Sequence, residues 1–196
     1  MRTALLFLFS GAWLIYKGGA VQKAYTLSPG YEVSIHGTFS IHGWSEKIEK
    51  VSGDLEGSLN GDGSAEVSLI RIIMSARSIR GDMGAVMNKK TYKALKADAN
   101  PDIIFSVTVP MRLIQIDSGE KAVPLRGTLT LAGVSRPVVM LIRSFKAGKR
   151  TMSIEGEQKI RMTDFGIRPP SALFGTMRAS PDITIDFKTD FTNNEP

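Results

Sequence analysis

The stretch LRGTLTLAGVSRPVVM, residues 125–140, carries the pattern that decides the fold. Its first half places leucine at alternate positions and polar residues between them: Leu125, Leu129 and Leu131 against Arg126, Thr128 and Thr130. Successive side chains of a strand point to opposite faces, so this alternation predicts a β-strand with one buried face and one wet face. The run Val138–Ile142 is apolar on both parities. We therefore expect a helix or a second subunit to cover its outer face, which makes a homodimer a candidate state.

The same alternation recurs along the chain, at residues 31–36, 105–113 and 183–188. Val67–Met74 is a second run that is apolar on both parities. Turn sequences such as Asn60–Gly63 and Lys146–Lys149 separate the segments. Together with strands near 47–55 and 151–162, the pattern gives about eight short strands, which is typical of a barrel or a sandwich. We predict an all-β fold with one short helix, and of the two architectures an eight-stranded antiparallel β-barrel.

One segment breaks the alternation, GDMGAVMNKKTYKALKA at residues 81–97. Its composition is helical and it places Met83, Met87 and Leu95 near one face. Asn100-Pro101 then prevents the helix from continuing. We expect a short helix that caps one end of the barrel with its methionines facing the core.

The first residues have the layout of a signal peptide. A basic start at Arg2 precedes a short apolar run, and Gly18-Gly19-Ala20 supplies small residues for cleavage. Residues 1–20 are therefore predicted to be removed, leaving one domain over residues 21–196 and a periplasmic or secreted protein. An uncleaved anchor is the alternative, although the run is short for a membrane span. The chain has no cysteine, which excludes disulfides and thiolate chemistry.

The charge pattern limits the classes of partner. The net charge of +6 falls to about +4 without Arg2 and Lys17, and acidic and basic residues are interspersed. No stripe of lysine and arginine predicts nucleic-acid binding, whereas transient contact with an anionic membrane surface is compatible with this charge.

Catalytic and metal-binding patterns are weak. The two histidines, His36 and His42, lack the spacing of a metal site, and no G-x-S-x-G sequence is present. Glu155 and Glu157 share a parity opposite to the apolar positions of their strand, so they are expected to face water. We predict no catalytic residue, no metal site and no cofactor, with an enzyme acting through His42 as the weakest alternative.

Near the C-terminus, FGIRPPSALFGTMR at residues 165–178 is apolar but unsuited to a central strand, because of its two prolines and glycine. Such a segment either packs under the domain or faces an apolar ligand.

Three stretches resemble the YceI-like family of polyisoprenoid-binding proteins. They are MNKKTYKALKADANPDIIF at 87–105, LRGTLTLAGVSRPVVM at 125–140, and FGIRPPSALFG followed by DITIDF. The resemblance covers essentially the whole chain after the leader. It implies an exported, lipocalin-like barrel that holds an isoprenoid or similar amphiphilic lipid, such as an isoprenoid quinone, along its axis and performs no catalysis.

Under this resemblance, apolar parity and the closing loop together select the candidate ligand-binding residues: Phe105, Val107, Leu129, Leu141, Phe165, Ile167 and Phe174. Arg71 and Arg143 interrupt apolar runs and are candidates for a headgroup contact, with ion-paired surface arginines as the alternative. The rival to a lipid carrier is a packed barrel of the cell envelope that binds no small molecule and acts through its surface.

Overall fold

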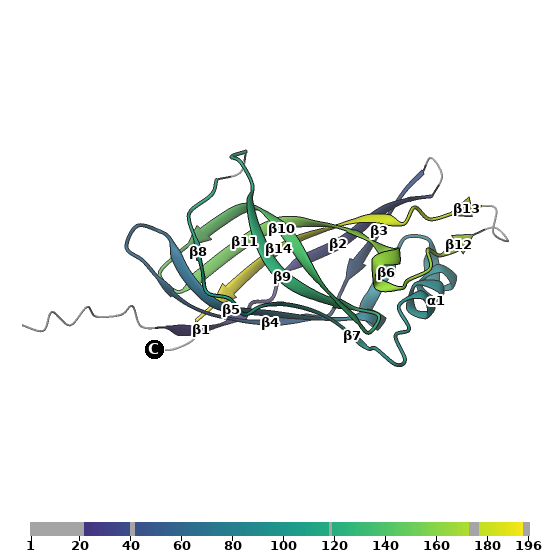
Figure 1. Cartoon of the computed structure of the whole chain (residues 1–196), viewed down its shortest axis with the longest axis horizontal. Coiled ribbons are helices and arrows are strands. Elements are labelled where there is room, and N and C mark those ends of the chain that lie inside the picture. Colours follow the sequence, from purple (N-terminus) through teal and green to yellow (C-terminus); the bar gives the residue numbers. More distant parts are fainter. Residues whose placement is uncertain (1–21, 40–41, 118, 173–176, 194–196) are drawn as a thin grey trace, which may run out of the picture.

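Eight antiparallel strand positions close into a barrel in the computed structural model, which describes residues 22–39, 42–117, 119–172 and 177–193 (Figure 1). Around the barrel the order is β1–β4–β5–β7–β9–β10–β11–β14, and β14 returns to β1. The predicted fold class is confirmed. These eight strands are β1 (Lys23–Leu27), β4 (Val51–Leu59), β5 (Ala65–Ser75), β7 (Asp102–Val107), β9 (Val123–Leu131), β10 (Val134–Ala147), β11 (Thr151–Arg161) and β14 (Asp182–Thr192).

Shorter elements complete the ring and its ends. They are β2 (Glu32–Phe39), β3 (His42–Ile48), β6 (Ile79–Gly81), β8 (Met111–Leu113), β12 (Ser171–Ala172), β13 (Met177–Arg178), the helix α1 (Gly84–Ala94) and the 3₁₀ turns η1 (Ala76–Ser78) and η2 (Met162–Phe165). β2, β3 and β6 extend three neighbouring strand positions past an interruption, because β2 follows β1, β3 precedes β4 and β6 follows β5. This extension makes the barrel elongated (Figure 1).

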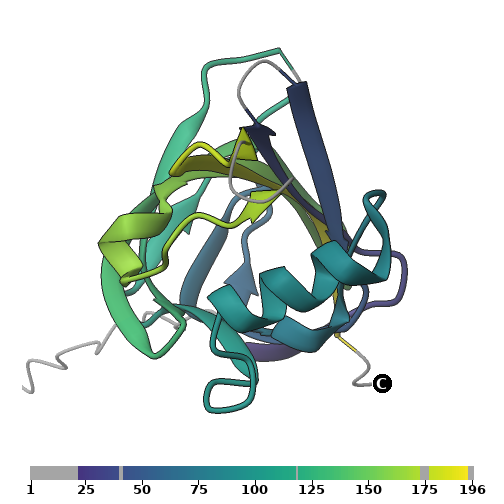
Figure 2. The same ribbon diagram turned by 90° about the vertical axis from the view of Figure 1, so that its right-hand side faces the viewer.

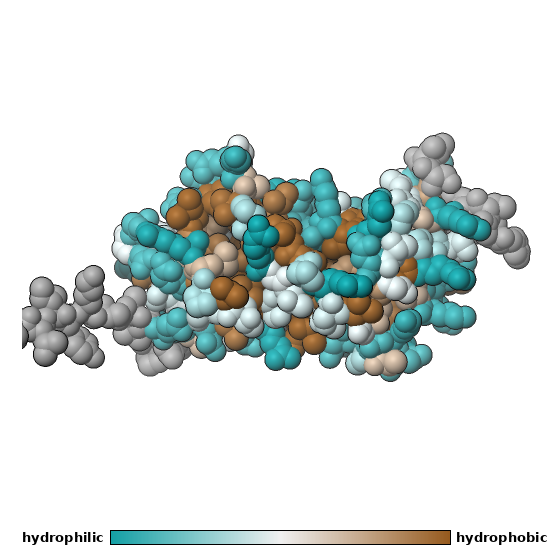
Figure 3. Space-filling model, in the orientation of Figure 1, coloured by the Kyte–Doolittle hydropathy of each residue, from teal (hydrophilic) through white to brown (hydrophobic). Residues whose placement is uncertain are grey.

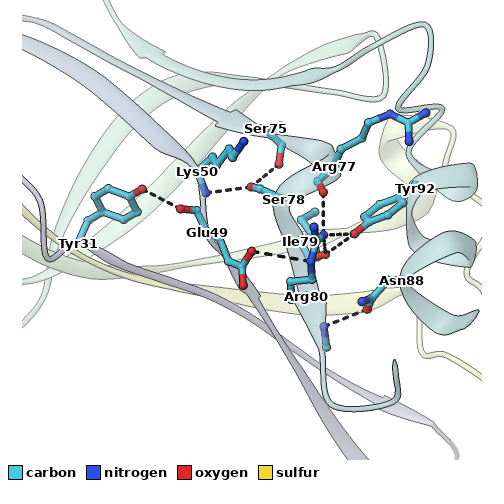
Figure 4. Close-up of polar contacts among 11 residues, drawn as sticks. Tyr31, Glu49, Lys50, Ser75, Arg77, Ser78, Ile79, Arg80, Asn88 and Tyr92 are labelled. Atoms are coloured by element: carbon cyan, nitrogen blue, oxygen red, sulfur yellow. Dashed lines mark hydrogen bonds and ion pairs between the residues drawn. The ribbon is translucent and has the colours of Figure 1, made fainter. Parts of the chain in front are cut away.

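Side chains satisfy the backbone groups that these interruptions release (Figure 4). Tyr31 donates its hydroxyl to the carbonyl oxygen of Glu49 at 2.9 Å. The Ser78 hydroxyl accepts from the amide of Lys50 at 3.0 Å and donates to the carbonyl oxygen of Ser75 at 2.8 Å. Buried backbone groups without partners are costly, so these contacts allow three strands to bend at one level of the barrel.

Helix α1 lies across one end of the barrel, beside η2 and β12–β13 (Figure 2). Met87 and Leu95 are buried against the core, and the Tyr92 hydroxyl donates to the carbonyl oxygen of Ile79 at 2.8 Å. The predicted capping helix is therefore present. Met83 departs from the prediction: it precedes the first helical residue and is 50% exposed. The helix begins at Gly84, so Met83 lies outside it and does not share the inward-facing side of Met87.

The opposite end of the barrel, near β8, is filled by side chains. Ile116 and Phe145 exchange two backbone hydrogen bonds of 3.1 Å, which draws the segment after β8 against β10. Large side chains that are almost completely buried gather around this bridge: Tyr25, Leu55, Leu113, Ile116, Phe145 and Phe191. This packing closes that end of the barrel with apolar core.

The outer face that carries β8, β9 and β10 shows hydrophobic residues among hydrophilic ones (Figure 3). Val139 and Leu141 on β10 are 40% and 37% exposed. No described element covers them, so the helix that was one of the two expected covers is not present on this face; cover by a second subunit stays a prediction. No helix in the described ranges has the length and apolarity needed to cross a membrane.

Candidate ligand-binding site

The barrel interior contains two small apolar cavities. The central cavity, of about 60 Å³, is lined by apolar side chains such as Val33, Phe105 and Met140, and by the polar Gln158 and Thr189. The helix-end cavity, of about 70 Å³, lies toward α1 and includes Ile35, Ile103 and Ile167. The two cavities share the side chains of Met74, Leu129 and Ile185. These three apolar residues therefore form a partition between the two cavities.

Most of the residues selected from the sequence lie inside the barrel. Phe105 lines the central cavity and Leu129 lines both cavities, while Ile167 lines the helix-end cavity. Val107 is 2% exposed and belongs to the packed core. Phe165 is also 2% exposed and lines a cleft in the barrel wall. Contact of these residues with a ligand stays a prediction.

Leu141 is misplaced by the sequence-based selection. Its side chain is on the outer face of β10, with Val139, whereas Ile142 is fully buried. The run is apolar on both parities, so period two could not show which parity faces inward. Met140, of the opposite parity, lines the central cavity instead. Phe174 lies outside the described residues.

Sequence reasoning missed Gln158, one of the two polar residues that line the central cavity. A signal was present, because Gln158 has the same parity as Ile154 and Ile160, which are buried. A polar residue at an inward position of a barrel strand is unusual and needs hydrogen-bond partners. The other polar residue of the cavity, Thr189, satisfies its hydroxyl by donating to the carbonyl oxygen of Ile154 at 3.0 Å.

A cleft opens the barrel wall between β10 and β11. The two strands pair from Ala147↔Met152 to Leu141↔Glu157, and their pairing stops there. Beyond this point β10 follows β9 and β11 follows β14, so the strands diverge toward the end that carries α1 (Figure 1). The resulting β10–β11 cleft has a volume of about 1070 Å³.

The cleft shares lining residues with both interior cavities. Gln158 lines the cleft and the central cavity, and Ile160 and Ile183 line the cleft and the helix-end cavity. At its far end the cleft is bounded by η2, where the Nε atom of Arg136 donates to the carbonyl oxygen of Asp164 at 3.2 Å. The floor of the cleft is therefore made of residues that also face the barrel interior.

Charged side chains line the rim of the cleft. Arg136, Lys159 and Arg161 supply positive charge, and Asp182 accepts from Arg161 at 2.9 Å. This hydrogen bond raises the pKa of Arg161. A polar rim above an apolar floor is the arrangement that an amphiphile requires.

A second polar group lies at the helix end. The Nε1 atom of Trp44 is buried without a hydrogen-bond partner among the described residues, beside an open hollow of about 570 Å³ that includes His42. Glu46 is buried nearby and accepts from the Thr91 hydroxyl at 2.8 Å. Burial raises the pKa of Glu46, and the hydrogen bond from Thr91 opposes the shift.

The remaining candidates for chemistry lie on the outer face. Arg143 pairs with Glu157 at 3.2 Å and with Asp186 at 2.6 Å, so it is an ion-paired surface arginine rather than a headgroup contact. Arg71 is exposed. Glu155 pairs with Lys188 on the same outer face, as its parity predicted.

Neither histidine is part of a metal cluster. His36 contacts the Ser34 hydroxyl at 3.0 Å, and His42 is exposed. Within the described ranges, no three side chains of the metal-binding types are close enough to share an ion.

The chain thus forms a closed antiparallel β-barrel with an apolar interior. The profile of the YceI-like domain matches residues 31–191, most of the chain. The chain therefore belongs to the YceI-like family. No curated protein shows a significant sequence match.

Solved structures share the fold. BcnA of Burkholderia cenocepacia is 15% identical, with a TM-score of 0.60 over 82% of this chain and 95% of that one. A polyisoprenoid-binding domain from Saccharophagus degradans, implicated in plant cell wall breakdown, is 14% identical, with a TM-score of 0.60 over 87% and 99%. The YceI protein of Campylobacter jejuni is 18% identical, with a TM-score of 0.55 over 76% and 85%. At these identities the likeness is one of fold.

Proposed function

We propose that the protein is an exported, non-catalytic carrier that binds the apolar chain of a polyisoprenoid or similar amphiphilic lipid inside the barrel. The observation that supports this most directly is the interior itself, in which two cavities with almost wholly apolar walls meet at Met74, Leu129 and Ile185. Family membership and the Saccharophagus degradans polyisoprenoid-binding domain support the choice of ligand class. Carriage or sequestration of an isoprenoid quinone is the most concrete form of the proposal.

Binding a long chain requires the partition between the cavities to move. A cavity of about 150 Å³ holds a ligand of the size of benzene, and each cavity here is smaller. Met74 belongs to the partition and Met140 lines the central cavity, and methionine adapts its shape at low cost. Each methylene-sized group then buried contributes about 0.8 kcal/mol, which offsets the cost of rearrangement. We propose that Phe105, Leu129 and Ile167 contact the chain.

The small cavities also support the rival function, a packed barrel that acts through its surface and binds no lipid. The two functions differ in whether the barrel contains or takes up a lipid. The decisive measurement is lipid extraction and native mass spectrometry of protein purified from its own source, followed by uptake of isoprenoids offered in solution. Bound lipid, or uptake, supports the carrier, and protein that carries none and takes up none overturns it.

A matched pair of variants tests whether the interior is the binding site. Leu129→Phe adds bulk to the partition, and Leu141→Phe makes the same exchange on the outer face. Overpacking costs about 1–3 kcal/mol, so thermal unfolding must first show that both variants are folded. Uptake should fall about tenfold in Leu129→Phe and stay unchanged in Leu141→Phe; an equal effect of both variants contradicts an interior site.

Export is part of the proposal. Cleavage after Ala20 would leave a mature protein that begins just before the first described residues. Cell fractionation and N-terminal sequencing of the native protein test it. Recovery of the full-length chain from the cytoplasm would contradict both export and cleavage.

The proposal includes two further contacts, one with a membrane surface and one with a second copy of the chain. Exposed Met83 and Val86, with Lys89 and Lys93 on the same helical segment, support transient contact of the α1 end with an anionic membrane, which vesicle co-sedimentation at low and high salt would test.

Exposed Val139 and Leu141 support a homodimer through β10, which sedimentation equilibrium would test.

A further inference from the structure

The ends of the barrel are poor entrances for a ligand. At the β8 end, large side chains such as Phe145 and Phe191 are almost completely buried. At the other end, α1 lies across the opening (Figure 2), and the side chains of Met87 and of Leu95, which follows the helix, are buried in the core. The β10–β11 cleft, in contrast, shares floor residues with both interior cavities. At this wall, single side chains such as Gln158 and Ile160 separate the interior from the open cleft.

Gln158 lies where the cleft meets the central cavity, and its hydrogen bonding is incomplete. The residue is 4% exposed. Its Nε2 atom donates to the carbonyl oxygen of Lys159 at 2.7 Å, which fixes the orientation of the amide because the oxygen cannot donate. Its Oε1 atom is buried and has no donor among the described residues. An unsatisfied buried acceptor is costly, so this atom has a hydrogen bond to gain from a ligand.

The unpaired atom defines the chemistry of its partner. Oε1 of an amide only accepts, so the complementary group is a hydroxyl or an amide N–H; among isoprenoid quinones it is the reduced quinol that carries such a donor, because the oxygens of the oxidised ring only accept. The other buried atom without a partner, Nε1 of Trp44, only donates and would select an acceptor. The two positions therefore prefer different headgroups, and a ligand can report which of them it uses. Gln158 is favoured because the cleft above it is the larger opening and has the polar rim of Arg136, Lys159 and Arg161.

We propose that the headgroup of the bound amphiphile lies in the β10–β11 cleft, where Gln158 Oε1 accepts a hydrogen bond from its hydroxyl or amide N–H, while the apolar chain extends into the interior cavities. This inference rests on the proposed function and adds the position and the chemical class of the headgroup. It makes Gln158 the residue that determines specificity among lipids with the same chain.

The first test compares geranylgeraniol, which carries a donor hydroxyl, with geranylgeranyl methyl ether, which has the same chain and no donor. The wild-type protein should bind the alcohol about tenfold more tightly, as expected for one buried hydrogen bond. Gln158→Met replaces the amide by an apolar chain of similar length, and the preference for the alcohol should disappear while the ether still binds. The ether thus shows that the variant is folded and keeps its cavity.

The outcomes separate the inference from the proposed function. Binding of both compounds with equal affinity, unchanged in Gln158→Met, overturns the headgroup position and leaves the carrier function standing. Equal binding of both compounds that weakens in Trp44→Phe and not in Gln158→Met places the headgroup at the helix end, because the oxygens of the alcohol and the ether both accept, and it also overturns the inference. Failure of the wild type to bind either compound overturns the proposed function, and the inference with it.

A second test uses the absence of cysteine in the chain, which makes single-cysteine variants unambiguous. Val138→Cys reports on the cleft, Ser45→Cys on the hollow beside Trp44, and Ser52→Cys on the exposed wall of β4. Saturating geranylgeraniol should slow alkylation of Val138→Cys by a polar maleimide about tenfold or more and leave the other two unchanged. Protection of Ser45→Cys without protection of Val138→Cys would overturn the inference.

Discussion

Gly156 shows how a single residue sets the shape of the interior. It is buried on β11, and a Cβ atom there would overlap the carbonyl oxygen of Leu141 and lie 2.7 Å from the ring of Phe187. Phe187 lines the central cavity, so the missing side chain at position 156 leaves room for that ring. Both neighbours are fixed, one by the backbone and one by packing.

We therefore expect Gly156→Ala to lower the free energy of unfolding by about 1–3 kcal/mol, because backbone and ring must both shift. Gly61→Ala is the matched control, since nothing lies within 4 Å of a Cβ at that position in the turn after β4. The control should change stability by less than about 0.5 kcal/mol. Denaturant unfolding measures both, and equal effects would contradict the packing argument.

Glu46 makes stability depend on pH. Its pKa is raised in the folded protein by burial, so the folded state holds the proton more tightly than the unfolded state does. The contribution of Glu46 is then fully present below the ordinary pKa of glutamate, about 4.3, and is lost as the pH rises through the raised value. Ionised Glu46 thus weakens the fold at neutral pH.

Glu46→Gln should keep the hydrogen bond from Thr91 and remove the buried charge. We expect it to raise the free energy of unfolding at pH 7 by on the order of 1 kcal/mol, with the gain disappearing below about pH 4. Chemical unfolding at several pH values tests this. A gain that persists at low pH would show that the charge is not its cause.

At the scale of the elements, the interrupted strands depend on Ser78. Its hydroxyl makes two backbone hydrogen bonds at the level where β3 passes into β4 and β5 into β6. Ser78→Ala should cost about 1–3 kcal/mol, because the amide of Lys50 loses its acceptor in a half-buried position. Ser52→Ala, on the exposed face of β4, should be neutral. Thermal unfolding of the two variants compares them, and equal midpoints would contradict the role of Ser78.

At the scale of the whole molecule, the sequence predicted the barrel well, because alternating strands such as β9 carry their buried face in their own pattern. The same reasoning placed Phe105 and Leu129 inside. It misplaced Leu141, because a run that is apolar on both parities does not show which parity faces the barrel interior. Met83 was misplaced because the start of α1 at Gly84 decides its exposure, and periodicity does not locate a helix start to one residue.

The cleft could not be predicted, because it depends on where two strands stop pairing. Both strands continue beyond the pair Leu141↔Glu157, β10 back to Val134 beside β9 and β11 on to Arg161 beside β14. Each remains a strand there, so its sequence does not show that the pairing between them has stopped. The interruption at Tyr31 and Ser78 was invisible for a similar reason, since it is fixed by contacts between residues far apart in the chain. Gln158 carried a local signal, but its missing partner is a property of the folded protein.

The divergence of β10 and β11 also gives a closed barrel two sheet edges in the middle of its wall. Unpaired strand edges recruit further strands, and proteins protect them with proline and with charged residues, lysine above all. The edges here carry Pro137 on β10 and Lys159 and Arg161 on β11. The same basic residues that form the rim of the cleft thus guard against aggregation.

Lys159→Thr combined with Pro137→Thr should therefore promote self-association by strand addition, seen as growing light scattering at micromolar concentration. Lys47→Thr is the control, because β3 is paired on both sides, to β2 and to β6. A double variant as monodisperse as this control would show that the edges need no protection. If the cleft also admits a ligand, as proposed above, its proline and its basic residues serve two purposes: they face the ligand and they keep strands of other chains from pairing with the open edges.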